Sequence, residues 1–136
     1  MSAPRRPRPP SRTTAAPEDL EIRRGDVLWI SCDPSVGAEP RKTRTCVVVS
    51  NDIANRYGEV VTVVPTQEYS SARAARAYMA DLRAPRSSLD VPRVANASMV
   101  MTYDRRRVVA RAGRVAPEAM KTIDRALSVH LGLASA

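Results

Sequence analysis

Short apolar, β-branched segments bounded by turn-forming residues constrain the fold of this sequence more than any other feature. The first segment runs from Asp26 to Cys32 and the second from Arg44 to Ser50, with a polar loop between them that contains Asp33-Pro34 and Gly37. Apolar runs of this length predict strands, and the first alternates in a way that predicts burial on both faces. Two such strands joined by a loop predict a pair at the start of a small sheet.

The middle of the chain continues the same pattern. A short helical turn is expected near residues 51–58, where asparagine and glycine gather. Further strands are predicted at residues 59–66, 94–103 and 108–115. Pro65 is expected to stop the first of these three strands, because proline cannot donate to a ladder of hydrogen bonds.

The last segment has the signals of a helix. Pro117 suits the first helical position and Gly132 suits the C-terminal stop. Its apolar stripe consists of Met120, Ile123, Leu127 and Leu131. Several short strands followed by one helix predict a mainly β fold of the α+β class, a curled antiparallel sheet or small barrel with a C-terminal helix.

Length and charge limit the class of protein. The 136 residues suffice for one domain with a modest core and are too few for two. The chain has 22 lysines and arginines against 14 acidic residues, a net charge of +8, and most of it lies beyond the first 20 residues. Such a basic domain favours a polyanionic partner, although arginine-rich proteins are often basic without one.

Composition also indicates the compartment. Residues 1–20 are rich in proline and arginine and predict a disordered basic tail, which leaves 21–136 as the folded domain. No apolar run approaches the roughly 20 residues of a membrane helix, and the N-terminus has no apolar core of a secretory signal. Cys32 and Cys46 lie in apolar runs and are expected to be buried free thiols. The predicted location is the cytoplasm.

The order and spacing of residues 24–55 resemble the opening of the MazF/PemK family, the toxin endoribonucleases of bacterial toxin–antitoxin pairs. The matching segments are Arg24 to Ile30, Asp33 to Glu39, Thr43 to Val49 and Ser50 to Asn55. The resemblance covers about residues 22–132 and is weakest between Gln67 and Arg93. It implies an SH3-like barrel with added helices and a homodimer. It also implies a strand at 78–82, where local propensity over 71–84 favours a helix.

Arg44 is the main candidate for catalysis. It stands where a loop meets a strand, so a rigid sheet can aim a guanidinium that presents planar donors to phosphate oxygens and stays charged. The resemblance implies that Arg44 is the catalytic arginine, although Thr45 stands where the family usually has proline. Without that motif, a solvated arginine at a strand start is the simpler interpretation. The single histidine, His130, is expected to complement a helix dipole rather than to catalyse.

The second catalytic position is open between Thr66 and Gln67. The family has a threonine after Val-Val-Pro and one apolar residue, whereas Thr66 follows Pro65 directly in this chain. A hydroxyl or an amide there can hydrogen-bond the scissile phosphate. Thr66 is the first choice, and a structural turn threonine is the alternative. Glu39 matches a family glutamate in the loop before Arg44 and is the candidate base or modulator of that arginine.

Basic, amide and aromatic residues around this site are candidate RNA contacts. Single-stranded RNA is bound through its phosphates, by stacking and through its base edges. The candidates are Arg41, Lys42, Gln67, Tyr69, Arg73, Arg76, Arg86 and Arg93. Tyr69 is the candidate for stacking. Met99 stands where family members often have a glutamine, so the sequence does not predict which RNA motif is recognised.

The resemblance implies a toxin that cuts single-stranded mRNA at specific sequences without a metal or other cofactor, and so blocks translation. Attack by the neighbouring 2′-hydroxyl leaves a 2′,3′-cyclic phosphate and a 5′-hydroxyl. The implied partner is an acidic antitoxin that folds as it binds the basic groove. The alternative is a non-catalytic module on the same fold that binds RNA or gyrase. The Trp-Gly-Ile ending of gyrase-poisoning relatives is missing from this chain.

Overall fold

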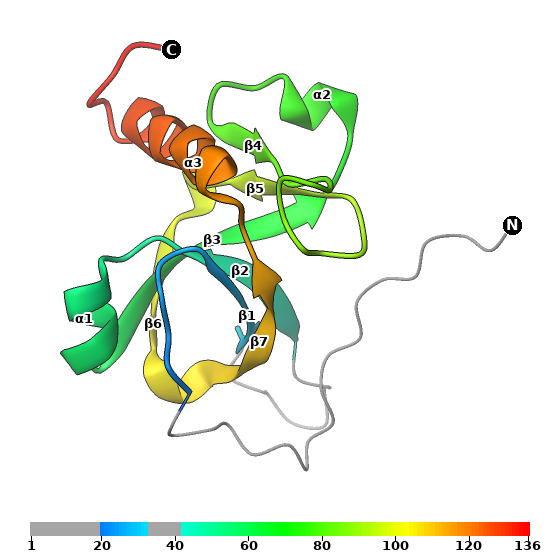
Figure 1. The fold of residues 1–136 in the computed structure, drawn as a ribbon. Helices are drawn as coiled ribbons and strands as arrows, with labels where there is room; N and C mark the ends of the chain where they lie inside the picture. The colour runs from blue at the N-terminus through cyan, green and yellow to red at the C-terminus, as the bar shows by residue number, and fades with distance from the viewer. Residues whose placement is uncertain (1–19, 33–41) are drawn as a thin grey trace, which may run out of the picture.

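A computed structural model describes residues 20–32 and 42–136, and their elements follow the order that the sequence predicts (Figure 1). The strands are β1 (Asp26–Ser31), β2 (Thr43–Val48), β3 (Val60–Glu68), β4 (Met79–Asp81), β5 (Arg93–Asn96), β6 (Met101–Asp104) and β7 (Val108–Arg114). The helices are α1 (Asp52–Tyr57), α2 (Ser71–Ala74) and α3 (Pro117–His130), with 3-10 turns η1 (Ala97–Met99) and η2 (Arg105–Arg107).

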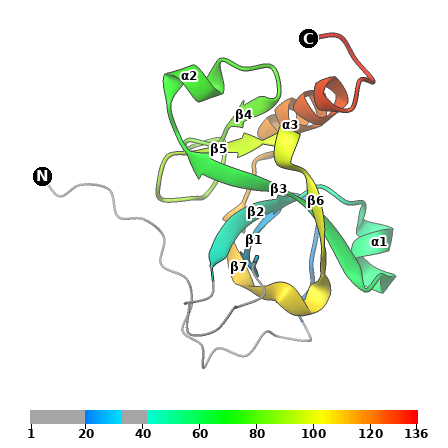
Figure 2. The same cartoon turned by 180° about the vertical axis from the view of Figure 1, so that it is seen from behind.

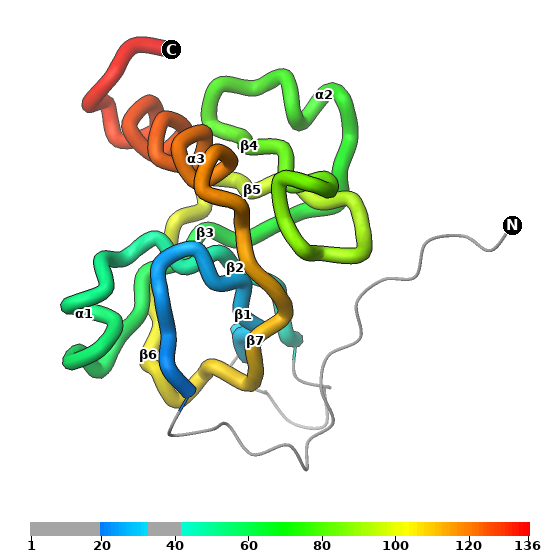
Figure 3. The backbone as a smooth tube through the Cα atoms, in the orientation of Figure 1, coloured from blue at the N-terminus to red at the C-terminus, as the bar shows by residue number. Residues whose placement is uncertain are grey.

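The strands form one curled antiparallel sheet in the order β4-β5-β3-β2-β1-β7, and β6 pairs with β3 beside this path. The long strand β3 joins the two parts, because residues 60–63 pair with β6 and residues 66–68 pair with β5. Figure 3 shows β3 leading from α1 at one end of the molecule to α2 at the other. The mainly β fold with a C-terminal helix is therefore confirmed.

Two apolar clusters lie on opposite faces of the sheet. In both cartoon views α3 lies beside β4 and β5 (Figures 1 and 2). The first core, which includes residues of α3, consists of Val27, Val47, Val64, Ala80, Leu82, Leu89, Ala95, Val115, Ala119, Met120 and Ile123. The second core lies within the curl and consists of Ile22, Leu28, Ile30, Cys46, Val48, Val61, Val63 and Val108. Consecutive residues of β1 and β2 alternate between the two cores, as the pleat of a strand requires.

Two predicted strand boundaries were wrong. β3 continues through Pro65 to Glu68, because Pro65 lies where β3 changes partner from β6 to β5 and a missing N–H is tolerated there. The single strand predicted over 94–103 is two strands, interrupted by η1. Its cause is Asn96, whose side chain caps η1 and turns the chain toward another part of the sheet.

The conflict over residues 71–84 is resolved mostly in favour of the strand. β4 forms over Met79–Asp81, and α2 is only four residues long. α3 begins at the predicted Pro117, and Gly132 follows it with a positive φ of 73°. Met120 and Ile123 of the predicted apolar stripe are buried, as expected. The prediction for Leu131 was wrong, because its side chain is 57% exposed.

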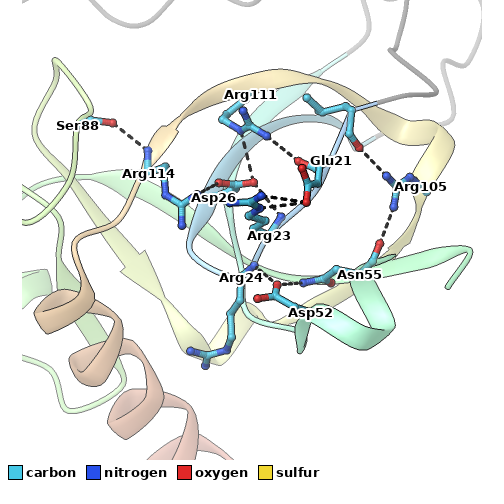
Figure 4. A network of polar contacts seen from close by, with 11 residues as sticks. Glu21, Arg23, Arg24, Asp26, Asp52, Asn55, Ser88, Arg105, Arg111 and Arg114 are labelled. Atoms are coloured by element: carbon cyan, nitrogen blue, oxygen red, sulfur yellow. Dashed lines mark hydrogen bonds and ion pairs between the residues drawn. The ribbon is translucent and has the colours of Figure 1, made fainter. Parts of the chain in front are cut away.

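An ion-pair network fastens β1 to β7. The carboxylate of Asp26 is fully buried, and Arg114 Nη1 lies 3.1 Å from its Oδ1. Arg111 Nε lies 3.4 Å from Oδ2, which also accepts the backbone N–H of Arg23 at 2.9 Å. Figure 4 shows these side chains converging on Asp26, with Glu21 beside Arg23. A buried carboxylate requires such partners, so this end of the barrel is held by arginines that have a structural role.

Candidate active site

Arg44 lies in β2 between two neighbouring strands. Its Cα is in register with Ile30 of β1, and β2 also pairs with β3 from Cys46 onward. Two residues along the strand, the Cys46 side chain belongs to the second core, so Arg44 extends from the same face of the sheet. The Arg44 side chain is exposed. Pairing with β1 at Arg44 itself, and with β3 two residues further on, gives this exposed guanidinium a rigid base.

Thr45 points to the opposite face and joins a buried polar cluster. Its Oγ1 lies 2.6 Å from Thr66 Oγ1, and both residues are buried, at 3% and 4% exposure. Arg93 Nε donates to Thr66 Oγ1 at 2.9 Å, and Arg93 Nη2 donates to the Thr66 carbonyl at the same distance. Thr45, which stands at the family's proline position, therefore ties β2 to β3 through side chains.

The register of β2 and β3 separates the two candidates for the second position. Pro65 is paired with Cys46, so both lie on one face, and Thr66 lies on the other face with Thr45. Gln67 follows and returns to the face of Arg44. The structure thus brings Arg44 and Gln67 to one side of the sheet, and it places the Thr66 hydroxyl on the side where Arg93 binds it.

The Gln67 amide has a defined set of neighbours. Its Oε1 accepts a hydrogen bond from Asn96 Nδ2 at 3.1 Å, and its Nε2 lies 4.0 Å from Met99 Sδ. Asn96 in turn is bound to Ser98. An amide therefore lies next to Met99, the position where the resemblance leads one to expect a glutamine. Sequence reasoning missed Asn96, and its only local signal is a short polar residue at a strand end.

Two titratable groups that share a face with Arg44, Cys46 and Tyr103, have raised pKa values. A hydrogen bond with Cys32, together with burial, raises the pKa of the Cys46 thiol well above its ordinary value. Burial and a hydrogen bond with Cys32 raise the pKa of Tyr103 to about 12. The Arg44 charge acts in the opposite direction on both groups. Cys46 is a buried free thiol, as predicted, whereas Cys32 is only half-buried. The raised pKa values of Cys46 and Tyr103 favour their uncharged forms, so neither group competes with an anion for the positive charge of Arg44.

The candidate RNA contacts fall into two groups. Lys42 is exposed just before β2, and its carbonyl accepts the N–H of Cys32. The Tyr69 ring is covered by the guanidinium of Arg83, which lies 3.9 Å from the ring centre and was not a predicted contact. Lys42 therefore adjoins Arg44, whereas Tyr69 is stacked by a residue of the chain itself.

The predicted arginines beyond β3 make contacts within the chain. Arg73 Nη1 donates to the Glu68 carbonyl at 2.8 Å, and Arg76 Nη1 donates to the Tyr78 hydroxyl at 2.7 Å. Arg86 lies 3.6 Å from Asp81. These contacts lie around α2 and β4, away from β2. Glu39 and Arg41 lie outside the described residues.

Three further observations concern residues 20–32 and 42–136. No three histidine, cysteine, aspartate or glutamate side chains in these ranges are grouped so that they could hold a metal ion. His130 is exposed in the last turn of α3. No helix among these described residues is long and apolar enough to cross a membrane.

The class of protein follows from comparison with known families. The family of PemK-like, MazF-like toxins of type II toxin–antitoxin systems matches residues 23–131. The chain belongs to this family, which confirms the predicted resemblance.

Individual relatives agree with this assignment. Endoribonuclease MazF9 of Mycobacterium tuberculosis (strain ATCC 25618 / H37Rv) is 34% identical over 117 residues, which are 82% of this chain and 98% of the relative. A mycobacterial endoribonuclease in complex with its cognate antitoxin has a TM-score of 0.67 at 22% identity, over 85% of this chain and 99% of that one.

A second solved structure gives the same result. The MazE–MazF complex (Form-II) of Deinococcus radiodurans has a TM-score of 0.69 at 19% identity, over 85% of this chain and 100% of that one. At this low identity, both solved structures support the fold alone.

Proposed function

We propose that this chain is a sequence-specific endoribonuclease that cuts single-stranded mRNA without a metal ion, as the toxin of a toxin–antitoxin pair. Membership of the toxin family and the relative MazF9 support this class of activity. The observation that carries the site assignment is the exposed Arg44 on a strand held between two others, with Gln67 on the same face.

In the proposed reaction the RNA supplies its own nucleophile. The 2′-oxygen forms a bond to phosphorus while the bond from phosphorus to the 5′-oxygen breaks, so the products carry a 2′,3′-cyclic phosphate and a 5′-hydroxyl. The 2′-hydroxyl loses its proton and the 5′-oxygen gains one. Arg44 donates two parallel hydrogen bonds to non-bridging oxygens as their negative charge increases. Glu39, outside the described residues, remains the candidate for the base.

We assign the second position to Gln67 and give Thr66 a structural role. Thr66 is buried, and its hydroxyl is already bound by Thr45 and Arg93. Gln67 shares a face with Arg44, and among residues 20–32 and 42–136 its Nε2 has a weak sulfur acceptor nearby, Met99 Sδ at 4.0 Å. An amide beside a guanidinium offers donors to two oxygens of one phosphate.

The proposal includes the partners and the compartment. The chain acts as a homodimer in the cytoplasm, and an acidic antitoxin covers its basic surface. RNA enters past Lys42, which is exposed beside Arg44. Arg73, Arg76 and Arg86 reach RNA only if their present contacts open, and Tyr69 stacks on a base only if Arg83 moves.

The test is cleavage of a long RNA by the purified protein in excess EDTA, with the new ends mapped. Cutting at a short recurrent motif, with 2′,3′-cyclic phosphate ends, supports the proposal. A substrate with one 2′-deoxy sugar at the mapped site should resist cutting, because it lacks the nucleophile. Cutting of that substrate, or loss of all activity in EDTA, contradicts the mechanism.

A further inference from the structure

Hydrogen bonds connect Ser98, Asn96 and Gln67 next to the candidate site. The backbone N–H of Ser98 determines which group donates and which accepts in each of them. Asn96 ends β5 and is 6% exposed. Its Oδ1 accepts the backbone N–H of Ser98 at 3.0 Å and lies 2.5 Å from Ser98 Oγ. A backbone N–H can only donate, so the atom of Asn96 that faces it must be the oxygen. The orientation of the Asn96 amide is therefore fixed without any assumption about its neighbours.

The orientation of Asn96 determines that of Gln67. Since the Asn96 oxygen faces Ser98, its Nδ2 faces Gln67 and donates to Gln67 Oε1 at 3.1 Å. The carbonyl oxygen of Gln67 is thus bound by an N–H group. The remaining polar atom, Nε2, has the sulfur of Met99 at 4.0 Å, which is a weak acceptor. In this arrangement Gln67 presents N–H groups, and not its carbonyl oxygen, to a ligand.

We infer that Asn96 is a positioning residue that holds the Gln67 amide as a donor toward a non-bridging oxygen of the scissile phosphate, beside Arg44. This inference rests on the proposed function. It gives Gln67 a defined role, because a held donor can stabilise negative charge on phosphate and cannot remove the proton of the 2′-hydroxyl. Ser98 fixes the Asn96 amide through its backbone N–H. Asn96 is therefore the residue whose side chain determines which end of the Gln67 amide faces the ligand.

The variant Asn96→Asp tests the orientation of the Gln67 amide, because it removes the donor that faces Gln67 and leaves the cap of η1 in place. An aspartate still accepts the Ser98 N–H and so keeps the cap of η1, but it cannot donate to Gln67. The Gln67 amide then turns to donate to the new carboxylate and presents its oxygen to RNA. Asn51→Asp is the matched control, because the Asn51 side chain is known only to accept the Ala54 N–H in the cap of α1, which aspartate does equally well.

The orientation can be measured without activity, because Gln67 is the only glutamine in the sequence. Labelling of glutamine with ¹⁵N at the side-chain amide gives one NH₂ signal pair in the free protein. We expect the Gln67 NH₂ protons to exchange freely with water in the wild type and in Asn51→Asp. In Asn96→Asp they should shift downfield and exchange more slowly. Identical signals in all three proteins would overturn the inference.

Cleavage rates then test the role toward phosphate. We expect Asn96→Asp to lower kcat/KM about 10- to 100-fold, the range for loss of a hydrogen bond to a charged group. In a Gln67→Met background the same change should cost less than about 2-fold, since the residue through which Asn96 acts is gone. Equal losses in both backgrounds would mean that the introduced carboxylate acts by its charge, and would overturn the inference. A wild-type protein that cuts no RNA would contradict the proposed function, while the amide signals would still test the orientation of Gln67.

Discussion

Arginine has opposite roles at two places in this small barrel. Near the start of β1, Arg111 and Arg114 converge on the fully buried carboxylate of Asp26 (Figure 4). In β2, Arg44 is exposed, and no ion pair joins it to a carboxylate among residues 20–32 and 42–136. The difference lies in the partner. An arginine that neutralises a buried acid has a structural role, whereas one with no acidic partner among the described residues keeps its charge for a ligand.

The same contrast divides the polar residues of β2 and β3. In the interior, Thr66 binds both Thr45 and Arg93. On the other face, within the part of the chain that the structure describes, the Gln67 donor has the sulfur atom of Met99 as its neighbour. Satisfied buried groups contribute stability, and unsatisfied exposed ones are available for binding. Activity and stability should therefore respond separately to substitutions at the two places.

The largest expected effect is that of Arg44→Ala on cleavage. Loss of a donor to the developing phosphate charge should lower kcat/KM by about 10²- to 10³-fold or more. The free energy of unfolding should change by less than about 0.5 kcal/mol, because the side chain is exposed. Cleavage of a defined RNA and thermal melting measure the two effects. Arg44→Lys is the control, since it keeps the charge and loses the two parallel donors; full activity of Arg44→Ala would remove Arg44 from the mechanism, whereas full activity of Arg44→Lys would show that the charge suffices without the two parallel donors.

Asp26→Asn should show the reverse behaviour. The amide cannot neutralise Arg111 and Arg114, so the free energy of unfolding should fall by about 3 kcal/mol, the low end for a buried pair because both arginines can regain water. Urea titration measures this loss. Activity per folded molecule should remain. Glu21→Gln, which changes an exposed acid of the same network, should cost less than about 0.5 kcal/mol. Equal costs for the two variants would refute the structural role of Asp26.

Asp104 provides an intermediate case that depends on pH. Hydrogen bonds from the side chain and the backbone N–H of Arg106 lower the pKa of Asp104 to about 2. Because the folded-state pKa is depressed, the contribution of Asp104 is present above the ordinary value of 3.8 and is lost as pH falls through about 2. Acid unfolding of Asp104→Asn should therefore be less steep in this window than that of the wild type. Parallel acid transitions in the two proteins would contradict the assignment.

The smallest effect is expected for His130→Ala. The single histidine is exposed at the end of α3, in a different element from Arg44. Cleavage rates between pH 5 and pH 8 should be the same in this variant and in the wild type. A change in the pH profile would indicate that His130 takes part in proton transfer, and it would weaken the contrast between catalytic and structural groups.

Most of the fold could be predicted from local patterns. Short apolar, β-branched runs predicted β1 and β2 to within two residues at each end, and Pro117 and Gly132 marked the limits of α3. The errors occurred at Pro65 and at residues 97–99, where strands change partners. The strand with which a segment pairs depends on residues distant in sequence, so a local sequence pattern cannot predict where the pairing partner changes.

The candidate site was only partly predictable. Arg44 could be found because a motif surrounds it, and its catalytic role stays a prediction until activity is measured. Thr45 and Asn96 could not be found, since each acquires its role from a partner 21 or 29 residues away in the chain. Glu39 and Arg41 stay predictions that the described residues do not test.

The sequence by itself determined the family and most of the strand pattern, and it singled out Arg44 as the main candidate for catalysis. Only the tertiary structure decided whether the side chain of Thr66 or that of Gln67 lies on the same face of the sheet as Arg44. Side chains alternate with a period of two along every strand, so the sequence shows that these neighbours point to opposite faces. Which of them shares a face with Arg44 depends on the register between β2 and β3, and a shift of one residue reverses the answer.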